Sequence, residues 1–237
     1  MAVLLLLVGF AINALSMLLS SRAIADVALL IAFLFSMTLA SLTFWRRAWL
    51  LAICASLVGF ALEVVGVRYG VPFGRYEYAE LGPSVLGVPV PIVIAWGIYL
   101  YACYLASSGI TSGFWRRSSL ASTFMVLLDL AVDPVMVELG VWTWHTHSSG
   151  WFGIPLSNFA GWFVVSMLAS VAYRILSRDA GPAETPALRY APLAYLAAFL
   201  PLLPIAGPRS IVPALAALGV AAGLVVVHWA RKNLNQS

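Results

Sequence analysis

Long apolar runs recur along the whole chain, separated by short breaks that carry Arg, Gly or Pro. A helix needs about 20 consecutive apolar residues to cross a bilayer. We therefore predict about eight membrane-spanning helices, at residues 3–20, 24–44, 48–67, 88–108, 119–139, 155–176, 189–206 and 211–229. The seventh is the weakest because Pro192, Pro201 and Pro204 interrupt it. The pattern predicts an all-α, polytopic membrane protein with a single domain at residues 1–237.

The distribution of charge agrees with this topology. Of the residues, 62% are hydrophobic and 9% are charged, against about 25% charged in a soluble domain. Eight spans place nine basic residues at one end of the helices: Arg46, Arg47, Arg116, Arg117, Arg174, Arg178, Arg189, Arg231 and Lys232. The other end has four: Arg22, Arg68, Arg75 and Arg209. Because positive residues collect in the cytoplasm, we expect both termini there. The net charge of +4 then reflects topology and does not indicate nucleic-acid binding.

A shift of 66 residues brings unusual residue types into register. Glu63 meets Asp129, Tyr76 and Tyr78 meet Trp142 and Trp144, the Gly-aliphatic-Pro segments at 87–89 and 153–155 coincide, and Trp96 meets Trp162. We interpret residues 48–108 and 119–176 as a tandem repeat of two helix hairpins in the same orientation. Such a repeat implies a pseudo-two-fold axis along the membrane normal. It would make Glu63 and Asp129 face each other across a central cavity, and it leaves Asp133 and Asn158 without polar mates.

The acidic residues inside the predicted spans are the strongest candidates for chemistry. Ionisable groups inside a bilayer are costly, rare and usually functional. Asp129 and Asp133 are four residues apart, so a helix places both on one face. Two carboxyl groups this close in a low dielectric tend to keep one proton near neutral pH, which makes a general acid. The alternative is that these acids and Asn158 only fix helix packing.

Aromatic residues fill the two loops next to these acids, at 68–86 and 141–152. Aromatic side chains commonly anchor a protein at the membrane interface. As a group beside carboxyl groups, they can also line a pocket for an apolar substrate and hold a cation against their ring faces.

Metal and thiol chemistry are not indicated. Only His145 and His147 lie close together, whereas a tetrahedral metal site takes three or four ligands. We expect no metal and no cofactor. Cys54 and Cys103 both fall in predicted spans, where we expect them to be small buried apolar residues.

Several motifs in this region together resemble a known family. They are FALEVVG at 60–66, YGVPFGRYEY at 69–78, LGVPVPIVIAW at 86–96, DLAVDPVM at 129–136, WTW at 142–144 and FGIPLSNFAGW at 152–162. These segments resemble the CruF-type carotenoid-biosynthesis membrane proteins over roughly residues 60–165, and the known members of that family are carotenoid hydratases. One departure from the family pattern is the longer link after Trp144, and this puts the end-group preference in doubt.

The resemblance implies a cofactor-independent hydro-lyase that acts on a lipophilic carotenoid in the bilayer. Water would add to the terminal C1–C2 double bond of an acyclic end group and give a tertiary alcohol. Asp129 or Asp133 would be the acid, and the other carboxylate, with Glu63 and Asn158, would orient the water. The substrate would contact the aromatic set Phe73, Tyr76, Tyr78, Trp96, Trp142, Trp144 and Trp162.

Two rival functions remain at this point. A carotenoid cyclase begins with the same protonation and lets an internal alkene trap the cation. A proton-coupled transporter would use Glu63, Asp129 and Asp133 as a relay. The charge topology places Glu63 and Asp133 in the outer half of the cell membrane and Asp129 near its middle.

Overall fold

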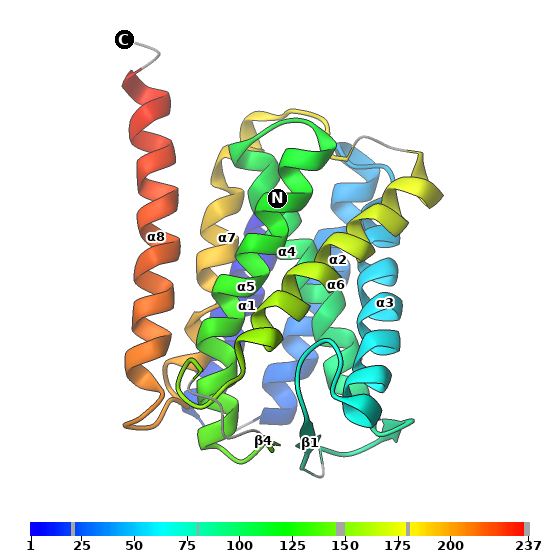
Figure 1. Ribbon diagram of the computed structural model, residues 1–237. Coiled ribbons are helices and arrows are strands. Elements are labelled where there is room, and N and C mark those ends of the chain that lie inside the picture. Colours follow the sequence, from blue (N-terminus) through cyan, green and yellow to red (C-terminus); the bar gives the residue numbers. More distant parts are fainter. Residues whose placement is uncertain (20–21, 80, 146–149, 179–180, 235–237) are drawn as a thin grey trace.

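The computed structural model describes residues 1–19, 22–79, 81–145, 150–178 and 181–234, and this part of the chain forms a bundle of helices (Figure 1). The full-length helices are α1 (Ala2–Leu18), α2 (Arg22–Thr43), α3 (Ala48–Tyr69), α4 (Val90–Ile110), α5 (Phe114–Glu138), α6 (Leu156–Ser177) and α8 (Ile211–Leu234). Among the described residues, six of these helices are long and apolar enough to cross a membrane, and α1 is apolar but shorter, with 17 residues. The predicted all-α polytopic bundle is confirmed.

The weak seventh span runs as three short helical pieces, η1 (Pro186–Tyr190), α7 (Ala191–Ala197) and η2 (Leu200–Leu202). The backbone of Leu188 packs directly on Gly109 at the end of α4, and Gly207 lies against Glu138 at the end of α5. Because those two helix ends lie at opposite ends of the bundle, the pieces together cross it. Proline has no N–H to donate to a helix, so a segment with several prolines breaks into such pieces.

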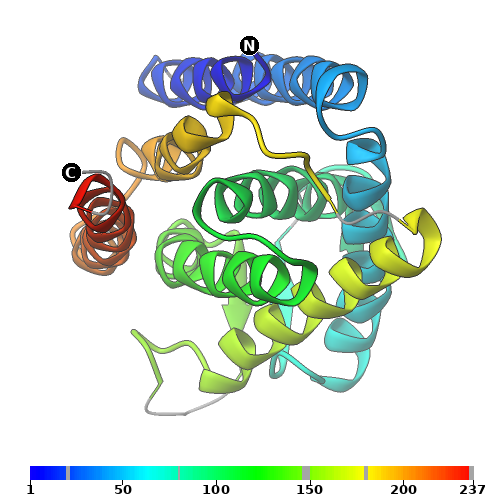
Figure 2. The same cartoon turned by 90° about the horizontal axis from the view of Figure 1, so that it is seen from above.

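Two helices form the centre of the bundle. Figure 2 shows α4 and α5 side by side in the middle, α1 and α2 along one edge, α6 crossing obliquely and α8 at the periphery. Helix α4 packs against α3, α5 and α7, and α5 packs against α4, α6 and α8. The core therefore includes large α4 side chains such as Tyr101 and Tyr104, which have no exposed surface.

A short antiparallel ribbon joins the two halves of the predicted repeat. Strand β1 (Tyr76–Tyr78) pairs with β4 (Trp142–Trp144), so that Tyr76 lies opposite Trp144 and Tyr78 opposite Trp142. The repeat makes Tyr76 equivalent to Trp142 and Tyr78 equivalent to Trp144. A half-turn about an axis through the centre of the ribbon would therefore place each strand on the other. The ribbon has the two-fold symmetry that the repeat predicts.

The turns that lead into α4 and α6 repeat the same backbone conformation. Leu86 and Gly87 have φ angles of 53° and 87°, and Phe152 and Gly153 have φ angles of 50° and 88°. Two consecutive positive φ angles are typical of a tight hairpin turn, and glycine adopts the second at little cost. The first turn joins β2 (Ser84–Val85) to β3 (Val88–Pro89), and the second closes a single bridge between residues 151 and 154. The tandem repeat is present in the backbone as well as in the sequence.

The two ends of the bundle differ. The strand end carries β1 and β4, whereas the loops after α2, α4 and α6 lie at the opposite end, where α8 also ends (Figure 1). We call the opposite end the arginine end, because those loops carry Arg46, Arg47, Arg116, Arg117 and Arg178 or adjoin them. The orientation of these ends in a cell membrane stays a prediction from the positive charges.

Candidate active site

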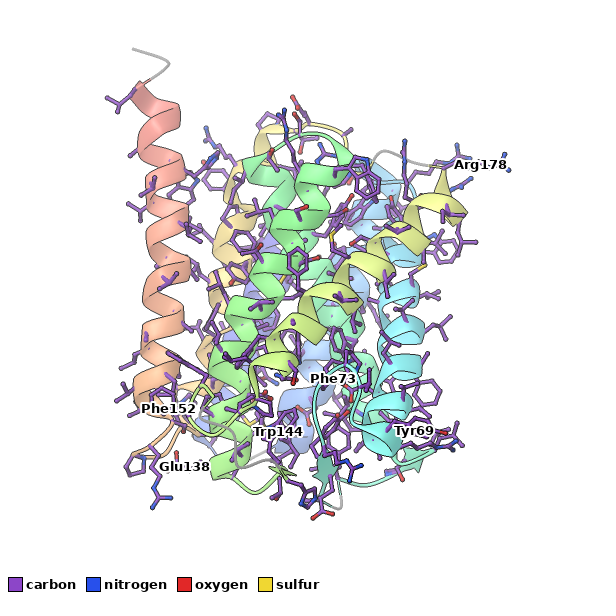
Figure 3. All side chains as sticks on the ribbon, viewed as in Figure 1. Tyr69, Phe73, Glu138, Trp144, Phe152 and Arg178 are labelled. Atoms are coloured by element: carbon purple, nitrogen blue, oxygen red, sulfur yellow. The ribbon has the colours of Figure 1, made fainter. Side chains whose placement is uncertain are left out.

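A small cavity of about 70 Å³ lies at the strand end, among α3, α4, α5, α6 and the β1–β4 ribbon. We call it the acidic cavity. Ten of the predicted site residues line it: Glu63, Phe73, Tyr76, Tyr78, Trp96, Asp133, Trp142, Trp144, Asn158 and Trp162. Figure 3 marks this region by the labels of Phe73 and Trp144. Residues from both repeat units therefore build one site.

Glu63 of α3 is held by three neutral donors. The hydroxyls of Tyr76 and Tyr78 both donate to its Oε2, the second at 2.8 Å, and the indole N–H of Trp96 donates to Oε1 at 3.0 Å. The side chain is buried, with 5% of its surface exposed. Both carboxyl oxygens therefore accept hydrogen bonds from neutral donors, which offsets part of the cost of burying this group.

The two tyrosines that hold Glu63 remain protonated. Burial, and then the negative charge of Glu63, raise the pKa of the Tyr76 hydroxyl. The same two causes, in the same order, raise the pKa of Tyr78 well above its usual value. Both hydroxyls therefore stay hydrogen-bond donors throughout the neutral range.

The second acidic group is a pair of carboxyls joined by an amide. The Nδ2 atom of Asn158 donates to Oδ2 of Asp129 and to Oδ2 of Asp133, each at 2.6 Å. All three side chains are at most 2% exposed. One amide nitrogen carries two hydrogens, so Asn158 can serve both carboxyls at once. It therefore fixes the distance and orientation of the two acids.

Local chain features position this carboxyl pair. Asp129 and Asp133 lie one turn apart on α5, and Pro134 follows inside the same helix. Pro134 has no N–H for the carbonyl of Leu130 four residues earlier, and the indole of Trp151 donates to that carbonyl instead, at 2.9 Å. The proline beside Asp133 thus ties α5 to the loop before α6, which carries Asn158 in its first turn.

Some polar atoms in and near the cavity have no direct partner. In the described part of the chain, the indole nitrogens of the cavity residues Trp142 and Trp144 are buried and form no hydrogen bond, and neither does Oδ1 of Asp129, which does not line the cavity. The Trp142 indole faces the Asp133 carboxyl. Buried polar groups in proteins are normally satisfied, often by an ordered water molecule. These atoms fit a site that binds water or an oxygen-bearing reaction product.

Ring faces complete the walls of the cavity. Trp96 lies 4.4 Å from Trp162, measured between ring centroids, and Tyr76 lies 5.0 Å from Trp144. Each contact joins one repeat unit to the other. A ring face attracts a cation placed within about 6 Å of its centroid. The site combines buried carboxyl groups with walls that tolerate a positive charge.

Comparison with known proteins agrees with the motifs in this region. The profile of the carotenoid biosynthesis protein family matches residues 12–226. The chain belongs to this family. It is also 34% identical over 137 residues to bisanhydrobacterioruberin hydratase of Haloarcula japonica, an alignment that covers 54% of this chain and 45% of the relative. The alignment thus spans less than half of that relative's length. No solved structure matches the chain.

Within this carotenoid biosynthesis protein, one predicted relationship differs. The repeat predicted that Glu63 faces Asp129 across the cavity, but Asp129 does not line it. Asp133, one turn nearer the strand end, lines the cavity together with Glu63. The expected pairing is therefore wrong, because the acid without a repeat mate takes the position opposite Glu63.

The structure adds cavity residues that the sequence did not single out, among them Tyr99 and Val132. Tyr99 lies three residues after Trp96 on α4, so the spacing of one helical turn would have indicated it. Val132 precedes Asp133 and is one apolar residue among many in an apolar helix, so nothing in the sequence distinguishes it. Apolar residues of this kind are recognisable only from the folded helix packing.

The remaining predicted features lie away from the cavity. Nε2 of His145 is 3.4 Å from Oε2 of Glu77 on the exposed side of the ribbon, and His147 is outside the described residues. In the described ranges, no three His, Cys, Asp or Glu side chains gather as metal ligands. Cys54 and Cys103 are buried and free, as predicted. Glu138 accepts hydrogen bonds from the backbone N–H groups of Arg209 and Ser210, just before α8.

Proposed function

We propose that this protein is a carotenoid hydratase, which adds water to the terminal C1–C2 double bond of an acyclic carotenoid end group. The observation that carries the proposal is that Asp133 and Glu63 line one buried cavity with aromatic walls. Membership of the carotenoid biosynthesis protein family and similarity to a hydratase over part of the chain support it.

Asp133 is the acid in this proposal, because it lines the cavity and Asp129 does not. Two carboxyl groups bound to one amide in a buried site retain a proton between them, since both cannot be charged at low cost. Asp133 gives that proton to C2 of the alkene. The electron pair of the double bond forms the new C–H bond, and C1 becomes a tertiary cation.

Glu63 and the ring faces stabilise this cation. Glu63 is already saturated by three donors, so it acts as a fixed negative charge and not as a proton donor. A preorganised charge aimed at the place where the opposite charge develops is usually a large part of catalysis. The indoles and phenols add attraction through their faces.

Water then attacks C1, and one of its protons returns to the Asp133 carboxylate. The acid is restored in each cycle, so the reaction consumes one water and no net proton. Asp129 acts through Asn158, which holds Asp133 in place. No cofactor is needed because the reaction involves no oxidation, reduction or group transfer.

The substrate reaches the site from the lipid. A cavity that accepts a six-carbon ring measures about 150 Å³, which exceeds the roughly 70 Å³ of the acidic cavity. Binding therefore widens the site, and the partly exposed rings of Trp144 and Trp162 are those that move. With both termini in the cytoplasm, the end group is modified in the outer half of the cell membrane, and the polyene extends through the hydrocarbon core.

Expression in a lycopene-producing host tests this function. The hydratase gives a product heavier than lycopene by one water or by two. An isomer of unchanged mass would instead identify a cyclase. Unaltered lycopene, with the protein present in the membrane, would contradict both enzymatic functions for this substrate.

A further inference from the structure

Four buried hydroxyl groups lie between the acidic cavity and the arginine end, and the proposed chemistry does not use them. They belong to Tyr104 of α4, Ser118 and Ser122 of α5, and Ser166 of α6. None of the four residues has any exposed surface. In the described part of the chain, none of the four oxygens forms a hydrogen bond. We call this set the hydroxyl file.

Other buried serines on helices of this protein have a hydrogen-bond partner in their own helix. A buried serine on a helix ordinarily donates to the carbonyl four residues earlier. Ser107, Ser108 and Ser170 do so here, at 2.7, 2.8 and 2.8 Å. Ser118, Ser122 and Ser166 do not form this bond, and their oxygens have no other partner in the described part of the chain. A buried hydroxyl without a partner costs about 1 to 3 kcal/mol, and a bound water removes that cost.

The hydroxyl file is in register with the carboxyl pair. At about 100° per residue, Ser118, Ser122 and Asp129 lie within a sector of about 40° on α5. Ser118 and Asp129 are separated by about 16 Å along the helix axis. The free Oδ1 atom of Asp129 is buried and unpaired like the four hydroxyls. One face of α5 therefore carries unpaired polar atoms from the arginine-end half to the edge of the acidic cavity.

Helices α4 and α6 complete the walls of this path. Helix α6 runs antiparallel to α5, with Asn158 bonded to the carboxyl pair and Arg174 over the Phe114 ring at 5.7 Å. Ser166 lies midway between Asn158 and Arg174, which places it level with the region of Ser122. On α4, the Tyr104 hydroxyl lies near the Ser118 hydroxyl.

The path ends near the surface at the arginine end. Arg117 lies beside Tyr104, and its Nε donates to the carbonyl of Thr111 at 3.2 Å. Thr111 borders an open groove of about 780 Å³ at that end of the bundle. Ser122 and Asp129 are about 10 Å apart along the axis of α5, which is the length of about three hydrogen-bonded water molecules. The fully buried Met125 lies between them in sequence, on the same face of the helix.

We infer that the hydroxyl file binds a row of water molecules, which delivers the water consumed in the reaction from the arginine end to Asp129 and the acidic cavity. The binding of water follows from the unpaired oxygens alone. Its role as the supply for the reaction rests on the proposed hydratase function. The aromatic side chains of β1 and β4 cover the acidic cavity at the strand end, so they block the shorter route by which water could reach it. Water would therefore need the longer internal route.

Radiolytic footprinting tests the water itself, because hydroxyl radicals formed by a brief X-ray pulse oxidise side chains next to bound water. Met125 should be oxidised despite its burial. Cys103 of α4 is an equally buried sulfur residue outside the hydroxyl file, and it is the internal control. If Met125 is protected as well as Cys103, the row of water does not exist.

Ser122→Val tests the supply, because valine removes the hydroxyl and fills its space. Lycopene in proteoliposomes made with D₂O allows two fates of the cation to be compared. In D₂O the acid adds a deuteron to C2 of the alkene. If water captures the cation, the product is the alcohol. If the cation instead loses the ordinary hydrogen of C2 as a proton, the alkene forms again and keeps the deuterium. We expect Ser122→Val to lower the rate of alcohol formation about 10-fold and to raise the ratio of deuterated alkene to alcohol.

The matched control is Ser107→Val, which makes the same change at a buried serine whose hydroxyl is satisfied by its own helix. A folding defect alone would lower the deuterated alkene and the alcohol together and leave their ratio unchanged, and that result would overturn the supply role. Failure of wild-type protein to form any alcohol would contradict the proposed function, whereas Met125 labelling would still decide whether the water is bound.

Discussion

The rings of Trp96 and Trp162 are in contact, with centroids 4.4 Å apart and planes tilted by 30°, and the two residues occupy equivalent positions in the repeat units. Each ring comes from the second helix of its unit, so the contact joins α4 to α6 close to the pseudo-two-fold axis. The Trp96 indole also donates to Glu63. The same pair therefore holds the repeat units together and positions one of the acids.

The role of Asp133 as proton donor predicts the effect of Asp133→Asn. A positioned general acid contributes about 100-fold to 10,000-fold to a rate. We expect a loss of this size in alcohol formation, measured in membranes that contain equal amounts of folded protein. Asp129→Asn should cost less, because Asp129 contacts Asn158 and does not line the cavity. An Asp133→Asn protein with full activity would remove Asp133 from the chemistry.

The amide of Asn158 should couple the two carboxyl groups energetically. Asn158→Leu has a similar shape but leaves two buried carboxyls without their donor, at a cost of about 1 to 3 kcal/mol in stability. The combination with Asp129→Asn should cost less than the sum of the two single changes, by about 0.5 to 3 kcal/mol. Thermal unfolding in detergent micelles measures this double-mutant cycle. Strict additivity would show that the amide does not join the two acids.

The tyrosine pair makes stability depend on alkaline pH. Burial and the Glu63 charge raise the pKa of Tyr76 and Tyr78 in the folded protein, whereas tyrosine in an unfolded chain ionises near about pH 10. The stabilisation is therefore complete below about pH 10 and is lost as the pH rises toward the folded pKa, by up to about 1.4 kcal/mol per pH unit and tyrosine.

Unfolding measured from about pH 8 to about pH 11 should show this loss. The variant with Tyr76→Phe and Tyr78→Phe is the control, since it cannot ionise at these positions. Its stability should decline less steeply than that of the wild type. Identical slopes in the two proteins would contradict the assignment.

The two hairpin turns should respond equally to the same substitution. Gly87 and Gly153 have φ angles of 87° and 88°, and an added Cβ would meet only an ordinary contact with Val67 at Gly87 and nothing within 4 Å at Gly153. The cost of alanine is then the backbone cost, about 1 to 2 kcal/mol at each site. Unfolding of the two single variants measures it. A large difference between them would show that the turns are not equivalent.

Much of the site was predictable because its acidic residues are rare in membrane spans. The carboxyls of the spans stand out against an apolar background, and a single shift of 66 residues aligns Glu63 with Asp129 and the loop aromatics Tyr76 and Tyr78 with Trp142 and Trp144. The order of the two hairpins then brings them together at one end. The length of the apolar runs predicted most helix ends to within about two residues, but α5 begins at Phe114 and not at 119, α8 ends at Leu234 and not at 229, and the seventh span is not one helix.

Other features depend on rotations and contacts that residue types do not specify. Asp129 and Asp133 lie on one helix face, so which of them lines the cavity depends on how far along α5 the cavity extends. The pairing of β1 with β4 involves only three residues in each strand, too few for a periodic pattern. The direction of a serine hydroxyl, as at Ser122, depends on its rotamer. These features therefore emerge only from the folded chain.

The ribbon formed by β1 and β4 resembles the interface of a symmetric homodimer. Two separate copies of one helix hairpin, associated about a dyad, would form the same antiparallel pair of strands. Such a homodimer has to present every side chain twice. A single chain that contains both units is free of that constraint, so Asp133 and Asn158 can stand in one unit while Val67 and Ile92 stand at the matching positions of the other. The covalent link between the units is what allows the site to be chemically asymmetric.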